Sequence, residues 1–285
     1  FVAKYDANGN PILLERYGTS STNVRSVSAV IDNNGNLVLS GTFKDSVQFN
    51  NGLTLRSDDG IDDYFYGNFD PVTLQPNWVK QILGIDNLKS GQIFEISTSP
   101  EAYYMTGLYA DSIGFENDTI VSYNHSYDVH IIKTDYAGDI QWMRTINGNI
   151  SETSWAITVD SDESVYFAGW FDSTTPSGGL TIDSTETTTI NRPGSAGSDD
   201  IFIGKYDTNG TLQWFKTAGG KSTDKVYDIV VYGEVVYVIG IFSDTLNWGG
   251  IEFTTHGPDD QDMFFGSLTL DGKFSSANSI DGYFS

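Results

Sequence analysis

Short turns rich in aspartate and asparagine are the first residues in this chain whose spacing suggests chemistry. Asp6 with Asn8, and Asp32 with Asn34, have the D-x-N spacing that opens a calcium loop, and a similar turn begins at Asp160. Carboxylate and amide oxygens suit Ca²⁺, but no turn is followed by the distant bidentate glutamate that completes an EF-hand loop. Asp and Asn also form turns by accepting hydrogen bonds from nearby backbone. We therefore predict turn-forming roles, with weak calcium binding as the alternative and no other cofactor.

A second acidic feature is an aspartate that recurs three or four residues after a repeated glycine. The four copies are Asp45, Asp111, Asp172 and Asp244. If the repeats surround one axis, these carboxylates would form a ring on one face, which could bind a cation or sugar hydroxyls. The alternative is structural, because Asp-Ser and Asp-Thr pairs begin turns. A residue that is present in every repeat through duplication is more often part of the scaffold.

Residues that break the repeat are the sharper functional candidates. Trp170 occupies a position where the other copies have Thr, Leu or Ile, and Trp155 and Trp248 are also unrepeated. Aromatic rings on loops can stack on sugars or anchor a protein partner. Packing beneath a long loop is the alternative for each one. We name these three tryptophans, together with the four recurring aspartates, as ligand-binding candidates.

The common catalytic and metal-binding patterns are missing from the sequence. There is no cysteine, which excludes disulfides and Cys-ligated zinc. The histidines His125, His130 and His256 have no metal-type spacing such as H-E-x-x-H. No Gly-x-Ser-x-Gly elbow and no phosphate-binding glycine loop occurs. We predict no catalytic residue and no metal site beyond the weak calcium candidates.

A repeated sequence unit sets where the strands lie. Its clearest copy is Asp-Ile-Phe-Ile-Gly-Lys-Tyr-Asp at residues 200–207, which leads through a Thr-Asn-Gly turn to a tryptophan. Copies begin at Asp63, Asp128, Asp200 and, in degenerate form, Asp262, and the first six residues match as well. The tryptophans that follow are Trp78, Trp142 and Trp214, which we predict to pack between repeats.

A second unit alternates with the first. It consists of two apolar stretches around a turn, and it ends in a glycine with an aromatic residue two positions later. Its copies are residues 29–43, 95–109, 157–171 and 229–242. The two units together predict four strands per repeat, joined by hairpin turns. Further strand-like residues at 47–49 and 53–55 lie in the connection between the second and third strands.

The repeats predict an all-β protein, specifically a β-propeller of four-stranded blades. The repeat length of roughly 65 residues is larger than that of the commonest blades, and a parallel solenoid has shorter coils with fewer hairpins. We divide a single domain, 1–285, into repeats of about 1–25 (partial), 26–90, 91–150, 151–222 and 223–285. Four full repeats and a partial fifth fit a five-bladed ring or an arc of a larger ring. The chain opens in mid-strand without a signal peptide, so we expect it to be part of a larger polypeptide.

Composition narrows the choice of partners. The chain has 15 Lys and Arg against 38 Asp and Glu, a net charge of −23 that repels nucleic acid and anionic lipid. No apolar run approaches the ~20 residues of a membrane helix, so we expect no direct membrane insertion. Aromatic residues at 14% and 30 glycines favour strands joined by tight turns. We expect neither nucleic acid nor lipid as a ligand.

The combined pattern resembles a known family. Asp-x-Phe-x-x-Lys-Tyr-Asp-x-x-Gly-x-x-x-Trp, followed by apolar-Asp-x-x-Gly-Asn-apolar-x-apolar-x-Gly-x-Phe, is similar to the bacterial β-propeller repeat proteins called SBBP-repeat proteins. The best matches are residues 200–220 and 27–43. The resemblance implies a secreted or cell-surface protein of the Bacteroidetes type. The family has no shared catalytic residues to carry over.

Three functional hypotheses follow from the sequence. The leading one is a non-catalytic, extracellular or cell-surface β-propeller that acts in binding, adhesion or display, with a protein or glycan ligand. The alternative is a glycoside-processing enzyme, because a propeller can hold two acids at one end of its central tunnel at the separation that such chemistry needs. The third is a purely architectural extracellular spacer.

Overall fold

The computed structural model is built from β-strands. It describes residues 1–18, 24–57, 62–84, 92–110, 112–115, 118–121, 126–148, 151–172, 180–183, 186–190, 198–257 and 260–282. Within these residues there are 26 strands and no helix, so none could span a membrane as a helix. The all-β prediction is confirmed.

Most strands belong to four antiparallel four-stranded units, which we call sheets I to IV; a parallel pairing of Tyr127 with Ser151 joins II to III. In each, sequence neighbours pair in order from the first strand to the fourth. Sheet I contains β3 (Val24–Ile31), β4 (Leu37–Lys44), β7 (Asp62–Phe69) and β8 (Pro76–Gly84). Sheet II contains β9 (Gln92–Thr98), β10 (Ala102–Ala110), β13 (Tyr127–Asp135) and β14 (Ile140–Asn147). Sheet III contains β15 (Ser151–Val159), β16 (Val165–Asp172), β19 (Asp200–Tyr206) and β20 (Leu212–Ala218). Sheet IV contains β21 (Asp224–Tyr232), β22 (Val235–Ser243), β25 (Gln261–Thr269) and β26 (Phe274–Ile280).

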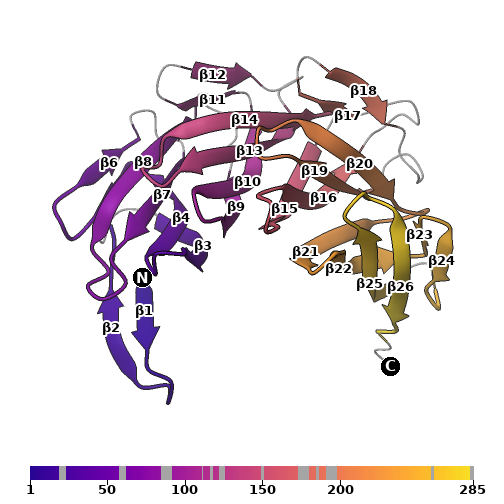
Figure 1. Ribbon diagram of the computed structural model, residues 1–285, viewed down its shortest axis with the longest axis horizontal. Coiled ribbons are helices and arrows are strands. Elements are labelled where there is room, and N and C mark those ends of the chain that lie inside the picture. Colours follow the sequence, from indigo (N-terminus) through magenta and orange to yellow (C-terminus); the bar gives the residue numbers. More distant parts are fainter. Residues whose placement is uncertain are drawn as a thin grey trace.

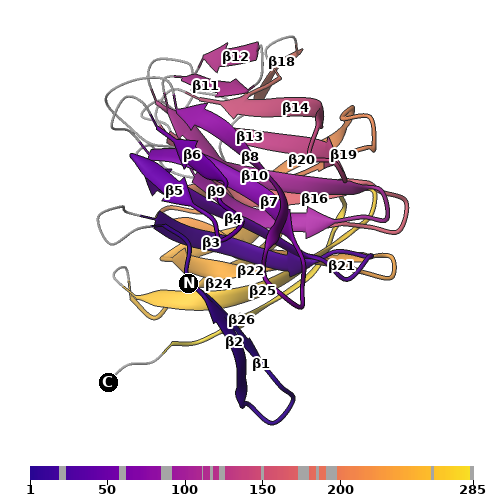
Figure 2. The same cartoon turned by 90° about the vertical axis from the view of Figure 1, so that its left-hand side faces the viewer.

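The sheets follow one another along an open arc, and a hairpin of β1 (Val2–Tyr5) and β2 (Pro11–Glu15) precedes sheet I (Figure 1). The first strands line the concave side, where β3 contacts β9, β9 contacts β15, and β15 contacts β21 (Figure 1). The connections between second and third strands lie on the opposite face from the hairpin turns, as Figure 2 shows from the side. The described residues therefore form an arc of sheets with a common inner edge.

Four short hairpins lie on the outer side of the arc, one in the connection between the second and third strands of each sheet (Figure 1). This agrees with the strand-like residues seen there in the sequence. They are β5 (Ser46–Gln48) with β6 (Thr54–Arg56), β11 (Ser112–Phe115) with β12 (Asp118–Val121), β17 (Leu180–Ile182) with β18 (Glu186–Ile190), and β23 (Thr245–Trp248) with β24 (Ile251–Thr254). The hairpins of sheets II and III pair with the fourth strand of the preceding sheet, β8 and β14. These hairpins therefore help to hold neighbouring sheets together.

The hydrophobic core is divided among the junctions between sheets. Three of the four buried clusters found among the described residues draw side chains from two neighbouring sheets, and the fourth lies within sheet I and its outer connection, with Val2 and Tyr17 packed against it. At the junction of sheets II and III, for example, Tyr104 and Val129 pack with Phe167 and Tyr206. Burial of apolar surface at such junctions is the main stabilising contribution, at about 25 cal/mol per Å². Each sheet thus depends on its neighbours for its core.

The predicted packing tryptophans are confirmed as contacts between sheets. Each lies on a fourth strand and donates its indole N–H to a carbonyl in the hairpin turn of the next sheet. The bonds are Trp78 to Tyr136 (3.1 Å), Trp142 to Thr208 (3.0 Å) and Trp214 to Leu270 (2.9 Å). Each ring also lies against a turn glycine with positive φ, and a Cβ at that glycine would overlap the indole. Two separate features therefore require glycine in these turns: the positive φ of the backbone and the close approach of the indole ring.

The repeated glycine of the second strand lies opposite a β-bulge in the first strand. The register shifts leave one unpaired residue per sheet, namely Val27, Phe94, Trp155 and Tyr227. At Gly41, Gly169 and Gly240 a Cβ would overlap a backbone carbonyl oxygen of the bulged strand. The glycine lets the two strands approach at the bulge, and the bulge re-aims the residue beside it.

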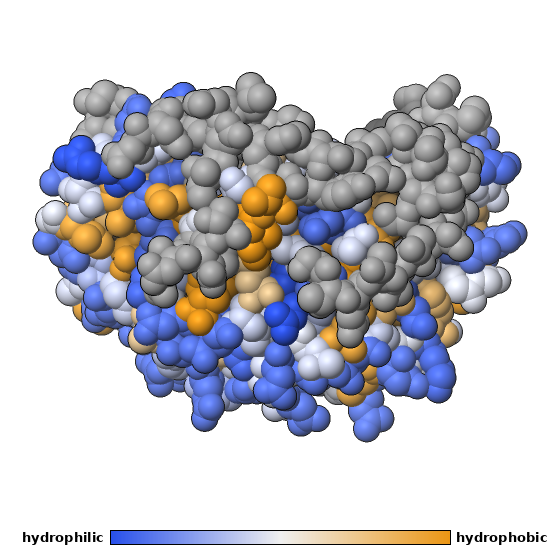
Figure 3. Space-filling model, turned by 90° about the horizontal axis from the view of Figure 1, so that it is seen from above, coloured by the Kyte–Doolittle hydropathy of each residue, from blue (hydrophilic) through white to orange (hydrophobic). Residues whose placement is uncertain are grey.

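The described convex surface is largely hydrophilic, with hydrophobic residues scattered among the polar ones (Figure 3). This distribution agrees with a net charge of −23 spread along the whole chain. The surface on this side is therefore that of a solvated scaffold.

Candidate ligand-binding site

Three aromatic rings meet where sheets III and IV adjoin. Trp155 and Trp170 lie 5.5 Å apart between ring centroids, at an interplanar angle of 30°. Tyr227 approaches both edge-on, with centroid distances of 6.4 Å to each tryptophan. Trp155 is 38% exposed and Tyr227 is 44% exposed, whereas Trp170 is partly buried. We call these three residues the aromatic cluster.

The β-bulges position this cluster. Trp155 is the bulged residue of β15 and Tyr227 is the bulged residue of β21. Trp170 lies on β16 and pairs with Thr153, which precedes the bulged Trp155 by two residues. Because β15 and β21 lie side by side on the inner edge of the arc, the same local distortion in two sheets brings the rings together.

A cation lies over the cluster. The Nζ atom of Lys225 is 5.0 Å from the ring centroid of Trp170, a cation–π contact, and 2.9 Å from the Oδ2 atom of Asp199. Such contacts fix the side chain of a long residue. The Trp170 ring thus contacts both Lys225 and Trp155, and a charged pair borders the aromatic cluster.

Two acids also lie on the inner strands, one residue after a bulge. Glu95 of β9 accepts a 2.6 Å hydrogen bond from the backbone N–H of Ile157 on β15. Burial, with a smaller contribution from the charge of Asp228 on β21, raises the pKa of Glu95 to about 7 against the lowering effect of that hydrogen bond. Asp228 is exposed and directly follows Tyr227. The inner edge therefore carries carboxyl groups close to the aromatic cluster.

Among the predicted aromatic candidates, the structure brings Trp155 and Trp170 together and separates Trp248 from them. Trp248 is 0% exposed and packs on Phe264 and Phe274, with ring centroids 5.3 Å and 5.0 Å away. Its indole N–H donates to the carbonyl of Ser267. Trp248 is therefore not a ligand-binding residue: it ends β23 of the outer hairpin and packs that hairpin onto β25 and β26 of sheet IV.

The recurring aspartates do not converge on one described site. Asp45 and Asp244 have φ values of 65° and 59° and open the outer hairpins at opposite ends of the arc. Their carbonyls accept hydrogen bonds from Ser57 and Thr255, so both act in turns. Asp172 ends β16, and Asp111 lies outside the described residues.

The candidate calcium turns use their carboxylates within the turn. The Oδ1 atom of Asp6 accepts from the backbone N–H groups of Asn8 and Asn10, and Asp32 does the same with Asn34 and Asn36. The Oδ2 atom of Asp32 accepts further bonds from buried neighbours. These hydrogen bonds support the turn-forming interpretation.

Tyr227, Lys225 and the acids were missed from the sequence. Tyr227 aligns with Trp155 once both strands are counted from the repeated glycine of the partner strand. A bulge displaces this alignment by one residue, so simple alternation does not reveal it. One sequence signal of this equivalence is that the bulged position holds a bulky, mainly apolar residue in every sheet: Val27, Phe94, Trp155 and Tyr227.

No protein-family model and no curated protein matches this chain.

Proposed function

We propose that the chain is a non-catalytic binding module and that the aromatic cluster is its ligand site. The observation that carries this proposal is the meeting of Trp155, Trp170 and Tyr227 as a partly exposed platform. Exposed aromatic rings that cluster, rather than occur singly, often mark binding sites. Lys225 and its partner Asp199 supply charged, hydrogen-bonding groups at its border. An apolar face with a few polar groups beside it suits the ring of a sugar, so a glycan is the ligand that we propose.

We further propose that sheets I to IV are successive blades of a β-propeller. The support is that each sheet is a four-stranded antiparallel meander whose first strand lies at the common inner edge (Figure 1). The resemblance of the repeat to SBBP-repeat proteins supports a secreted or cell-surface location. In that setting the module would serve in adhesion or display, with a glycan or a glycosylated protein as partner.

A glycan array followed by calorimetry tests the binding proposal. We expect a carbohydrate ligand whose affinity falls at least about tenfold in Trp155→Ala and in Trp170→Ala. Each substitution removes the contacts of one ring, which contribute roughly 1.4 kcal/mol or more to the binding free energy. Tyr232→Ala is the matched control, since this tyrosine lies on the same strand as Tyr227 and is 79% exposed. A ligand that binds both tryptophan variants normally would place the site elsewhere. The lack of any carbohydrate ligand would favour an architectural spacer.

A glycoside-processing enzyme is the second candidate, because Glu95 has the raised pKa of a general acid and Asp228 lies near it. The binding proposal is preferred because Glu95 has a structural task. Its carboxylate joins β9 to β15 through Ile157, and Ser28 joins β3 to β9 in the same way by accepting from Ile96 at 3.3 Å. Release of reducing ends from a bound glycan, abolished in Glu95→Gln with binding retained, would establish the enzyme instead.

A further inference from the structure

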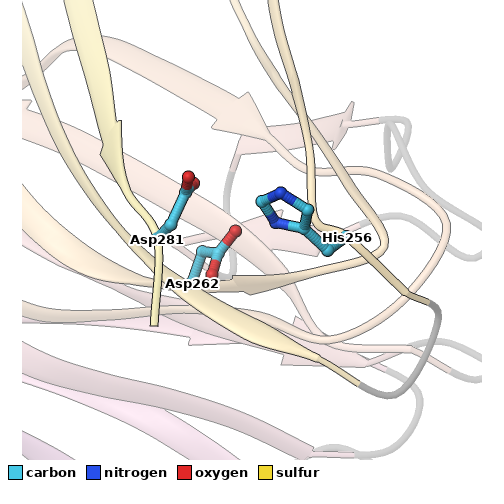
Figure 4. A group of neighbouring side chains, drawn as sticks. All are labelled: His256, Asp262 and Asp281. Atoms are coloured by element: carbon cyan, nitrogen blue, oxygen red, sulfur yellow. The ribbon is translucent and has the colours of Figure 1, made fainter. Parts of the chain in front are cut away.

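Three potential metal ligands meet at the edge of sheet IV. They are His256, in the loop after β24, Asp262, the second residue of β25, and Asp281, directly after β26 (Figure 4). One ligand atom from each residue lies within 4.8 Å of the others. His256 and Asp281 are exposed, whereas Asp262 is only 4% exposed. The three residues span the connection, the third strand and the end of the fourth strand of one sheet.

Only one of the two carboxylate oxygens of the buried Asp262 accepts a hydrogen bond from the described residues. Its Oδ1 atom accepts a 2.8 Å hydrogen bond from the backbone N–H of Gly282. Its Oδ2 atom is buried and has no hydrogen-bond partner among the described residues. A buried carboxylate oxygen without a hydrogen-bond partner is strongly unfavourable, and a cation beside it would offset that penalty. Figure 4 shows the Asp262 carboxylate facing the space between His256 and Asp281.

The same position in other sheets has different neighbours. The equivalent Asp128 and Asp200 lie beside an acid from the first strand of the following sheet, Glu152 and Asp224 respectively. Burial, reinforced by the neighbouring carboxylate, raises the pKa of Glu152 and Asp224, so protons relieve the charge there. At Asp262 a histidine replaces this arrangement. The repeat therefore supplies a buried carboxylate, and in sheet IV the imidazole of His256 lies beside it.

The backbone around the cluster is held in place. The N–H of Thr255 donates to the carbonyl of Asp244 at 2.9 Å, and its hydroxyl donates to the carbonyl of Gly257 at 2.7 Å. These bonds bracket His256. The bond from Gly282 to Asp262 fixes the segment that carries Asp281. Ligands from two anchored segments and one strand are thus preorganised, which lowers the entropic penalty of binding an ion.

We propose that His256, Asp262 and Asp281 bind a divalent transition-metal ion. One imidazole nitrogen and two carboxylate oxygens suit Zn²⁺ or Mn²⁺ better than Ca²⁺ or Mg²⁺, which prefer oxygen alone. Tetrahedral Zn²⁺ needs ligand atoms about 2.0–2.2 Å from the metal, so the exposed side chains of His256 and Asp281 close inward by small rotations. Three protein ligands leave a coordination position for water or for an external ligand. The ion would fasten the end of β26 to the outer connection of its own sheet.

Titration of the metal-free full chain with ZnCl₂, MnCl₂, CoCl₂ and CaCl₂ tests the site. We expect one equivalent of Zn²⁺ or Mn²⁺ to bind by calorimetry, with a rise in the melting temperature, and Co²⁺ to develop visible absorption bands. His256→Gln and Asp281→Asn should each weaken binding by about tenfold or more. Both side chains are exposed, so neither variant is expected to prevent folding. Asp271→Asn, an exposed acid in the β25–β26 turn, is the matched control and should bind as the wild-type chain does.

Two outcomes would overturn the proposal. Metal binding that is only millimolar, or that is unaffected by His256→Gln and Asp281→Asn, would be adventitious. Absence of metal binding, together with destabilisation of the metal-free chain by His256→Gln, would show that the histidine serves as an ion-pair partner of the two aspartates.

Discussion

The indole N–H of Trp142 donates to the carbonyl oxygen of Thr208, 3.0 Å away, across the boundary between sheets II and III. The same ring packs on Tyr104 and Tyr206, with centroid distances of 6.1 Å and 6.0 Å, and lies against Gly210. A single side chain therefore joins a polar bond to the apolar core of the junction. Because this contact recurs at each described junction after sheet I, it explains why the repeat keeps a tryptophan at this place.

Trp142→Ala should lower the free energy of unfolding by about 3 kcal/mol, the low end for loss of a large aromatic, because the ring is only partly buried. Trp142→Phe should lose about 1 kcal/mol for the hydrogen bond together with part of the packing. Urea denaturation followed by circular dichroism measures both. Trp155→Ala, which removes a more exposed tryptophan, should change the stability by less. Equal losses in Trp142→Ala and Trp155→Ala would show that the junction bond carries no special weight.

Gly240→Ala should destabilise the chain by about 3 kcal/mol, the upper end of overpacking, because the new Cβ overlaps the carbonyl oxygen of Lys225 at the bulge. Gly9→Ala provides the comparison. Its φ is +81° but nothing lies within 4 Å of a Cβ, so it should lose only about 1–2 kcal/mol. Thermal melts of the two variants measure the difference. A smaller loss at Gly240 than at Gly9 would contradict the role assigned to the bulge.

Stability should fall as the pH rises from 5 to 8. Burial, and then the charge of Asp200, raises the pKa of Asp224 to about 8, and burial next to Asp128 raises the pKa of Glu152 well above its ordinary value. Below pH about 4 both the folded and the unfolded chain hold these protons. Between pH 4 and 8 the folded chain holds more protons than the unfolded chain, so stability decreases with pH. Urea midpoints across this range provide the measurement.

Asp224→Asn should flatten this pH dependence, because the amide oxygen still accepts from Gly220 and no buried charge forms. Asp271→Asn should leave the dependence as it is, since that carboxylate is exposed and its pKa is lowered by Lys273. An equally steep loss of stability in Asp224→Asn and in the wild-type chain would contradict the assignment to Asp224.

Glu95→Gln should leave stability unchanged below pH 6 and raise it above pH 8. The glutamine oxygen still accepts the hydrogen bond from Ile157, while the buried charge that forms above the pKa of about 7 is removed. Glu95→Ala removes the hydrogen bond and should destabilise at every pH. Differential scanning calorimetry at pH 5.5 and 8.5 separates the two variants. Destabilisation by Glu95→Gln at the higher pH would show that the ionised carboxylate is favourable there.

The sequence repeat was sufficient to predict the four strands of each sheet and their order along the chain. The hairpin turns, glycines and tryptophans that mark these strands recur at similar spacings within each repeat. It also predicted that Trp142 and its equivalents pack between repeats. Burial of the single residue Trp248 could not be inferred, since its environment is an outer hairpin whose docking depends on the neighbouring sheet. An unrepeated tryptophan looks the same in sequence whether it faces solvent or fills a core.

The candidate sites depend on contacts between distant residues. Tyr227 joins Trp155 only because two bulges lie side by side on adjacent inner strands. His256, Asp262 and Asp281 come from three separate segments, so no short metal-binding motif connects them. The repeat predicts where Asp262 lies but not which side chains face it, because the loops that carry these neighbours vary between repeats.

The indole bonds between sheets all point in one direction along the chain. The acceptor of the Trp142 indole N–H, Thr208, follows the tryptophan by 66 positions and is therefore synthesised later. In the last described sheet Ser276 occupies the position of the tryptophan. During synthesis on the ribosome, each of sheets I to III would therefore emerge with an exposed indole that only the next sheet can cover. Completion of one sheet thereby becomes the template for the next, and the order of translation becomes the order of assembly.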